Sequence, residues 1–131
     1  MKNTKIISGL LYWTEGSNSR TETRVTNCDS EIIALWVKCL RERYHVNEKK
    51  IRVRLQIWKD EDENKHANFW STLLKIPRNQ FHKIRKVKRG KKKGKFDHGI
   101  CGITVYSTDL VKKIERDIKY VKTFLKTKDL N

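Results

Sequence analysis

The clearest pattern in the chain is the strict alternation of apolar and polar residues in the stretch IRVRLQIW, residues 51–58. A period of two is typical of a β-strand that buries one face. The apolar face consists of Ile51, Val53, Leu55 and Ile57. The opposite face consists of Arg52, Arg54, Gln56 and Trp58. Guanidinium groups, an amide and an aromatic ring suit phosphates and base edges. We therefore interpret this face as a nucleic-acid-binding surface, with an ordinary solvated face as the alternative.

Helical periodicity predicts four helices, at residues 4–14, 30–44, 60–76 and 107–125. The first is almost wholly apolar, so we expect it to be buried on most sides. Asp29 has the chemistry of an N-cap for the second helix, and Pro77 ends the third. The acidic run DEDEN opens the third helix. We interpret it as a cap rather than a metal site, because it lacks the alternating ligands of a calcium loop.

Further strands are predicted at residues 20–27, 81–89 and 99–107, the last two forming a hairpin around GKKKGKFDHG. No long linker or tandem repeat divides the 131 residues, a length that suffices for one domain with a core. We therefore predict a single α+β domain over residues 1–131, with helices on one face of a mostly antiparallel sheet.

The net charge of +16 indicates an anionic partner, because the positive charges of such a chain repel one another unless an anion is bound. Nucleic acid is the commonest polyanion, and an acidic membrane surface is the alternative. No stretch approaches the roughly 18 apolar residues of a transmembrane helix, and we find no signal-peptide pattern. Cys28, Cys39 and Cys101 are too widely spaced for a zinc site, so we expect free thiols in a reducing compartment. The expected location is the cytoplasm (nucleoid-associated in a prokaryote) or an organelle, without secretion.

Charge is densest between Lys83 and Lys95, where nine of thirteen residues are basic. The remaining 22 bases still exceed the 15 acids by seven, so the excess is partly local and partly distributed. We interpret the segment as an arm that lies along phosphates and releases counterions, with a disordered basic loop as the alternative. Its basic residues are Lys83, Arg85, Lys86, Lys88, Arg89, Lys91, Lys92, Lys93 and Lys95.

Common catalytic and nucleotide-binding motifs are absent: the sequence contains no GxSxG, P-loop or GxGxxG. We therefore expect no small-molecule substrate. The four histidines have no metal-ligand spacing. His98 follows Asp97, an arrangement compatible with a base and its orienting acid, although we favour a polar strand start.

The stretch SGLLYWTEGS, residues 8–17, ends its apolar run in Glu15 and Gly16. A carboxylate at a helix C-terminus is unfavourable by about 0.3–1 kcal/mol. Glu15 therefore either needs a compensating partner such as a metal ion or is a solvent-facing helix end. The stretch resembles the motif of the LAGLIDADG homing endonucleases, with Glu15 and Gly16 on the closing Asp-Gly and with Leu10 and Trp13 departing from the pattern. The strand RVTN, the helix in CDSEIIALWVKCLRERYHV and the alternating strand follow in matching order, so that the resemblance covers residues 4–76.

The resemblance implies an αββαββα-type core, to which residues 78–107 add a basic hairpin. Family members pair two motif helices, and with one motif per chain the resemblance implies a homodimer. The expected seam consists of Thr4, Ser8, Gly9, Leu11 and Tyr12. The carboxylates of two chains would then meet and bind Mg²⁺, or Mn²⁺, which activates water for phosphodiester cleavage.

Site residues follow from the same resemblance. It assigns Glu15 and Gly16 to the metal site and Asn27 to the positioning of water. Lys75 or Arg78 would place a cation near the scissile phosphate. The DNA-facing sheet would present the Arg52 to Trp58 face together with Arg20, Glu22, Arg24 and Thr26.

The resemblance and the charge together predict a site-specific endonuclease that cleaves double-stranded DNA. A non-catalytic DNA- or RNA-binding protein on the same fold, acting as a regulator or splicing helper, is the second hypothesis. An RNA-binding protein of ribosomal type is the third, because it requires only the charge.

Overall fold

The computed structural model describes residues 2–88 and 97–127. The elements in chain order are α1 (Lys2–Glu15), β1 (Thr23–Asn27), α2 (Ser30–Glu42), β2 (Arg52–Trp58), α3 (Glu63–Leu74), β3 (Arg85–Val87), β4 (Ile100–Val105) and α4 (Thr108–Thr127). Short 3-10 turns lie at Glu48–Lys50 and Arg78–Gln80. The α+β class is thus confirmed.

The order of elements differs from the expected αββαββα arrangement, because one strand instead of two separates α1 from α2. In place of the additional strand, Gly16 forms an isolated antiparallel bridge to Val25. The residues between them read SNSRTETR and lack an apolar alternation that a longer strand would bury.

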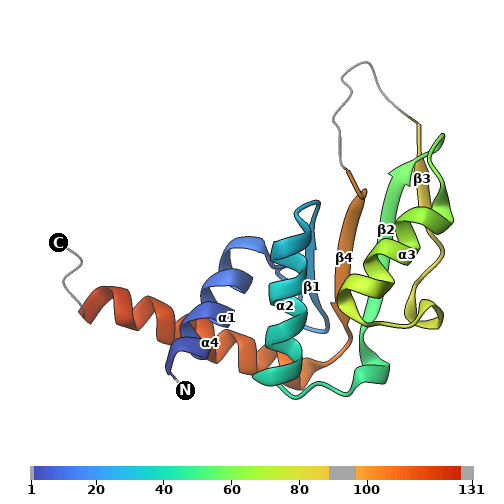
Figure 1. Ribbon diagram of the computed structural model, residues 1–131. Coiled ribbons are helices and arrows are strands. Elements are labelled where there is room, and N and C mark those ends of the chain that lie inside the picture. The colour runs from blue at the N-terminus through green and yellow to red at the C-terminus, as the bar shows by residue number, and fades with distance from the viewer. Residues whose placement is uncertain (1, 89–96, 128–131) are drawn as a thin grey trace.

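The four strands form one mixed sheet in the order β1-β4-β2-β3 (Figure 1). β4 runs antiparallel to both β1 and β2, whereas β3 runs parallel to β2. The predicted hairpin of residues 81–89 and 99–107 is therefore wrong, because β2 lies between β3 and β4. β2 has two edges, and it forms hydrogen bonds with β3 along one edge and with β4 along the other. The parallel pair of β2 and β3 requires a crossover connection, which contains α3.

The helix caps are those expected from the sequence. The side chain of Asp29 accepts a hydrogen bond from the Glu31 amide at the start of α2. At the start of α3, the Asp62 side chain accepts from the amides of Asn64 and Lys65. The acidic run thus contributes the cap of α3, as predicted.

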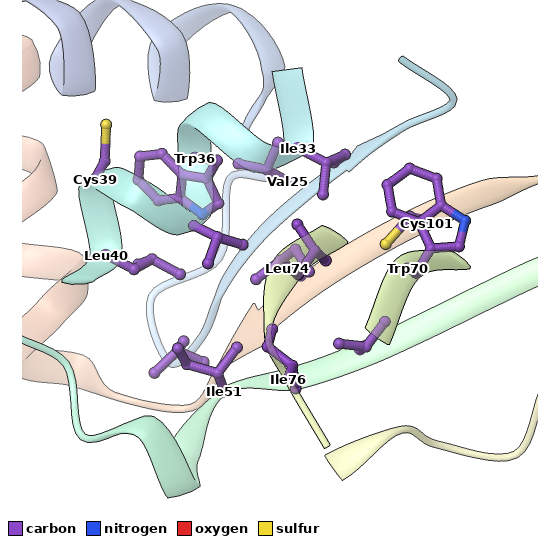
Figure 2. Packing of buried hydrophobic residues seen from close by; sticks show 14 of the residues in the cluster. Val25, Ile33, Trp36, Cys39, Leu40, Ile51, Trp70, Leu74, Ile76 and Cys101 are labelled. Atoms are coloured by element: carbon purple, nitrogen blue, oxygen red, sulfur yellow. The ribbon is translucent and has the colours of Figure 1, made fainter. Parts of the chain in front are cut away.

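One face of the sheet forms the core with α2 and α3 (Figure 2). Alternation in β2 is confirmed, since its apolar side chains are buried and none of its polar ones is. The centre of the core contains two fully buried indoles, Trp36 from α2 and Trp70 from α3. Figure 2 shows them with the aliphatic side chains that surround them, including Ile33, Leu40, Leu74 and Ile76.

α1 and α4 pack against each other beside the β1 edge (Figure 1). Gly9 allows the close contact, because a Cβ there would lie 2.7 Å from the carbonyl oxygen of Asp117. Asp117 is itself 4% exposed and receives two hydrogen bonds from the Arg43 guanidinium, at 2.6 and 2.7 Å, and one from the Tyr44 hydroxyl. This buried cluster joins α4 to the end of α2.

The expectation that the first helix is buried on most sides is wrong. Ile7, Leu10 and Trp13 form an apolar row at a spacing of three residues along α1, each 44–45% exposed. α4, α2 and β1 cover other sides of the helix, and Lys122 of α4 lies over the Trp13 ring, 5.0 Å from its centroid.

Candidate nucleic-acid interface

The outer face is the face of the sheet opposite the helices, and the strand register arranges its side chains in rows. In the first row Thr104 of β4 lies between Arg24 of β1 and Arg52 of β2. In the second row Gly102 separates Thr26 from Arg54. The third row joins Ile100, Gln56 and Arg85, and Trp58 follows beside Val87.

Arg24 of β1 and Arg52 and Arg54 of β2 thus share the outer face with Arg85 of β3. Arg24 pairs with Glu22 at 3.0 Å, and Arg54 donates a hydrogen bond of 2.9 Å to the Tyr106 hydroxyl. Arg52 donates to the carbonyl of Lys49. Glu22 precedes Arg24 by two residues, so its charge offsets only one of these guanidiniums. The face is cationic and rich in hydrogen-bond donors, a combination that suits phosphates and base edges.

The basic residues after α3 are distributed over both faces of the sheet. Lys83, Arg85 and Lys88 are exposed. Lys86 differs, because its ammonium lies 3.4 Å from the carboxylate of Glu63, at the start of a helix that covers the inner face. Its role in the basic arm stays a prediction, and in this structure its charge is paired with Glu63. The other basic residues assigned to this arm, Arg89, Lys91, Lys92, Lys93 and Lys95, lie outside the described residues.

Glu15 and Asn27 meet as the resemblance implied. The Asn27 side-chain amide donates a hydrogen bond of 3.0 Å to Glu15 Oε2. The side-chain oxygen Oδ1 of Asn27 accepts a hydrogen bond of 2.9 Å from the Asp29 backbone amide, which fixes the orientation of the Asn27 side chain. Both residues are partly exposed. Gly16 lies under the ring of Tyr12, where a Cβ would be 2.5 Å from ring carbons. The carboxylate thus sits at the junction of α1, β1 and the start of α2.

Lys75 and Arg78 do not join this pair within one chain. Arg41, in the last turn of α2, donates hydrogen bonds to the carbonyls of Leu74 and Lys75 at 2.7 and 3.1 Å. Lys75 therefore lies at the C-terminal end of α2, whereas Asn27 lies at its N-terminal end. A helix of 13 residues separates the two sites by about 20 Å. Arg78 contacts Asn68 and the ring of Phe81 instead.

The predicted dimer seam is covered by the chain itself. Ser8, Gly9 and Tyr12 are buried. The hydroxyl of Ser8 donates to the Thr4 carbonyl and to Asp117, and Leu11 packs against the core. This seam is wrong because α4 of the same chain occupies the small-residue face of α1. The part of α1 that remains open is the row of Ile7, Leu10 and Trp13.

Sequence reasoning missed three outer-face residues, His82, Thr104 and Tyr106. Alternation would have identified two of them, because Gly102, Thr104 and Tyr106 follow one another at every second position of β4 and its extension. The position of His82 on the outer face cannot be predicted from neighbouring residues, because it depends on the parallel bridge between Val53 and Phe81.

His98 occupies a structural position. Its ring stacks on Phe69 with centroids 3.5 Å apart, and its carbonyl accepts a hydrogen bond of 2.7 Å from the Trp70 indole. These contacts fit the favoured interpretation of a strand start. Within residues 2–88 and 97–127, no three His, Cys, Asp or Glu side chains are grouped so that they could hold a metal ion.

Comparison with protein-family models, curated proteins and solved structures gave no match to the chain. In the part of the chain that the structure describes, no helix combines the length and the hydropathy needed to cross a bilayer.

Proposed function

We propose that the protein binds double-stranded DNA with the outer face of its sheet and cleaves it as a homodimer, with Mg²⁺ or Mn²⁺ bound at Glu15. The observation that carries the proposal is the hydrogen bond from Asn27 to Glu15, at the end of a helix whose outward side is apolar and open. A carboxylate with a fixed amide beside it can hold a metal-bound water in position.

A homodimer would carry one such site in each chain. Three large apolar side chains on one 14-residue helix favour a helix partner, since a contiguous apolar surface is costly in water. We propose a second copy of α1 as that partner, packed through Ile7, Leu10 and Trp13. This seam replaces the small-residue seam that α4 covers.

One carboxylate per chain is compatible with the proposed metal. Mg²⁺ is usually bound through one or two carboxylates, waters and substrate phosphates, rather than in a cage made by protein alone. In each chain, Glu15 and the phosphates of DNA would supply this set. The bound ion would supply an activated water and stabilise the leaving oxygen. Asn27 would orient that water.

A second function, nucleic-acid binding without cleavage, is favoured by a specific feature of the site. The outer face is complete without Glu15, and the Asn27 amide already satisfies one oxygen of this carboxylate. A regulator or splicing helper would need only the outer face and the basic segment after α3.

The decisive experiment compares wild type with Glu15→Gln in a Mg²⁺-dependent nicking assay on a bound DNA duplex. We expect the substitution to abolish cleavage and leave DNA binding unchanged or slightly tighter, because a negative charge near phosphate is removed. Glu42→Gln is the matched control, since Glu42 is an exposed helix-end acid that pairs only weakly with Lys38, at 3.8 Å. Cleavage that persists in Glu15→Gln would remove Glu15 from the mechanism. A wild type that binds DNA without cutting it would favour the regulator.

A further inference from the structure

Among the described residues, five buried side-chain polar atoms have no hydrogen-bond partner. Three of them lie on the outer face: Thr104 Oγ1, Arg24 Nε and His82 Nε2. Thr104 is completely buried. Buried polar atoms are nearly always hydrogen-bonded in folded proteins. Three exceptions on one face of a four-stranded sheet therefore indicate a common cause.

The sheet register places these atoms in one cluster. Thr104 lies opposite Arg24 on one side and Arg52 on the other. His82 lies beyond β2, where its amide donates a hydrogen bond of 2.9 Å to the carbonyl of Val53. Strands are about 4.8 Å apart, so the backbones of Arg24 and His82 are separated by about 14 Å. An arginine and an imidazole reaching toward each other span that distance.

His82 belongs to the outer face because its neighbour belongs to the inner one. Phe81 packs against the core, and successive side chains of an extended segment point to opposite faces. The pKa of His82 is lowered by burial first, and then by the positive charges of Arg54, Arg52 and Arg24. The same three guanidiniums thus act on the imidazole.

All three arginines hold their guanidiniums toward one end of the sheet. Arg24 is held by Glu22, Arg52 by the Lys49 carbonyl and Arg54 by the Tyr106 hydroxyl. Glu22, Tyr106 and Lys49 lie at the end of the sheet where β1 and β2 begin and β4 ends. In residues 2–88 and 97–127, Glu22 is the one carboxylate paired with Arg24, Arg52 or Arg54, so that two of these three positive charges are not offset by a described carboxylate.

The chemistry of the cluster identifies its ligand. The Arg24 Nε–H and the Thr104 hydroxyl can donate hydrogen bonds, as can His82 Nε2 when it carries a proton. A guanidinium has no hydrogen-bond acceptor, so the arginines beside Thr104 cannot accept a hydrogen bond from its hydroxyl group. A group with several acceptor oxygens and a negative charge satisfies all these donors, and phosphate is such a group. A guanine edge offers acceptors but no charge to favour a protonated imidazole.

We propose that this cluster binds one phosphate group of the DNA backbone over Thr104, and that His82 takes up a proton from solvent when the phosphate binds. The identity of the phosphate as part of DNA rests on the proposed function, whereas the anion site itself does not. On binding, Arg24 and Arg54 turn from Glu22 and Tyr106 toward the phosphate.

The direction of the pH effect follows from linkage. The surrounding arginines favour neutral His82 in the free protein, and a phosphate nearby favours the imidazolium. The charged groups that act on His82 are Arg24 from β1 and Arg52 and Arg54 from β2. Within the window between the free and the bound pKa, binding consumes a proton, so affinity rises as pH falls. Above and below that window the slope disappears.

The test has two arms. In the first, inorganic phosphate is added to isotope-labelled wild-type protein while the imidazole resonances are followed by NMR from pH 5 to 8. We expect phosphate to raise the titration midpoint of one histidine, assigned to His82 by its loss in His82→Gln. Thr104→Val should weaken phosphate binding about fivefold, the loss typical of one hydrogen bond.

In the second arm, duplex DNA affinity is measured from pH 6 to 8 at constant ionic strength. Wild type should bind more tightly at low pH, by at most about tenfold per pH unit for one proton. His82→Gln should flatten this slope. His45→Asn is the control and should keep it, because His45 is exposed at the end of α2, and Asn tolerates its φ of 49°.

The outcomes separate this site from the proposed function. If phosphate leaves every histidine midpoint unchanged in folded wild-type protein, the anion site is wrong, even if DNA binds. If DNA binds with the same pH slope in wild type and His82→Gln, proton uptake by His82 is wrong while DNA binding stands. If phosphate moves the His82 midpoint and duplex DNA does not bind, the anion site stands and the proposed function fails. The main result of the first arm is measured on wild-type protein. The NMR experiment therefore still tests the anion site if one of the variants is unstable.

Discussion

Gly9 lies where α1 packs closely against α4. Its hypothetical Cβ would lie 2.7 Å from a backbone oxygen and 2.9 Å from a methyl group of Val121. Backbone cannot move aside as a flexible side chain can, so even one methyl group forces the helices apart. The apolar run at the N-terminus therefore depends on this glycine for its place in the fold.

We predict that Gly9→Ala lowers the free energy of unfolding by about 1–3 kcal/mol, the usual cost of overpacking. The better helix propensity of alanine offsets part of this. Thr14→Ala, at an exposed position of the same helix, should change stability by less than about 0.5 kcal/mol. Urea denaturation followed by circular dichroism measures both variants. Equal stability of Gly9→Ala and wild type would contradict the close packing of α1 on α4.

The three cysteines differ in burial, and their reactivity should follow. Cys28 is exposed, whereas Cys39 and Cys101 are buried. Burial raises the pKa of Cys39 to about 11 and raises that of Cys101 as well. The thiolate is the reactive form, so both buried thiols remain neutral at ordinary pH.

We predict that iodoacetamide at pH 8 modifies one thiol of the folded protein and three after denaturation. Peptide mass mapping should place the native modification on Cys28. Since the folded pKa of Cys39 lies above its usual 9.0, the neutral thiol stabilises the fold below that pH, and this contribution is lost as pH rises toward 11. Rapid native labelling of Cys39 would show that the α2 packing is wrong.

At the scale of elements, α4 is joined to α2 by one buried ion pair. Arg43 and Asp117 have side chains 18% and 6% exposed, and the Tyr44 hydroxyl also donates to this carboxylate. The same helix carries a second aspartate, Asp109, which pairs with Lys113 at 3.2 Å on the surface. The two aspartates provide a comparison of a buried and an exposed pair.

We predict that Asp117→Asn destabilises the protein by about 3 kcal/mol, at the lower end of the range for breaking a buried pair, because Arg43 keeps some contact with water. Asp109→Asn should cost at most about 1 kcal/mol. Thermal unfolding of both variants is the measurement. Similar losses in the two variants would mean that the buried pair does not anchor α4.

At the scale of the whole molecule, the open row of α1 is the surface that a second copy would cover. Two other large apolar side chains, Leu35 of α2 and Leu73 of α3, are exposed to a similar extent, at 40% and 41%. Because these leucines lie on other helices, replacing one of them is a control for replacing Leu10 in the row on α1.

We predict that wild type sediments as a dimer on DNA and that Leu10→Glu sediments as a monomer and loses cleavage, because two opposed carboxylates would be buried in the seam. Leu35→Glu should remain dimeric and active. Analytical ultracentrifugation with and without duplex DNA makes the comparison. A monomeric wild type under both conditions would contradict the dimer.

Local interactions explain which elements the sequence predicted well. The alternation of β2 and the caps of α2 and α3 depend on neighbours within a few residues, and each lies where the pattern placed it. Strand pairing has no such local rule. Proximity in sequence favours a hairpin of residues 81–89 and 99–107, whereas in the fold β2 pairs with both β3 and β4 and lies between them.

Composition and periodicity directly encode the α+β class, the two faces of β2 and the positive charge of the chain, so these features can be predicted without a structure. Tertiary structure decided which surfaces remain open. Ser8 and Gly9 have the small size of a helix seam, but only the fold shows that α4 of the same chain covers them. Thr104 and His82 meet the arginines through the register of four strands. Because a side chain's neighbours are set by contacts between distant segments, neither its partners nor its exposure can be inferred from local pattern alone.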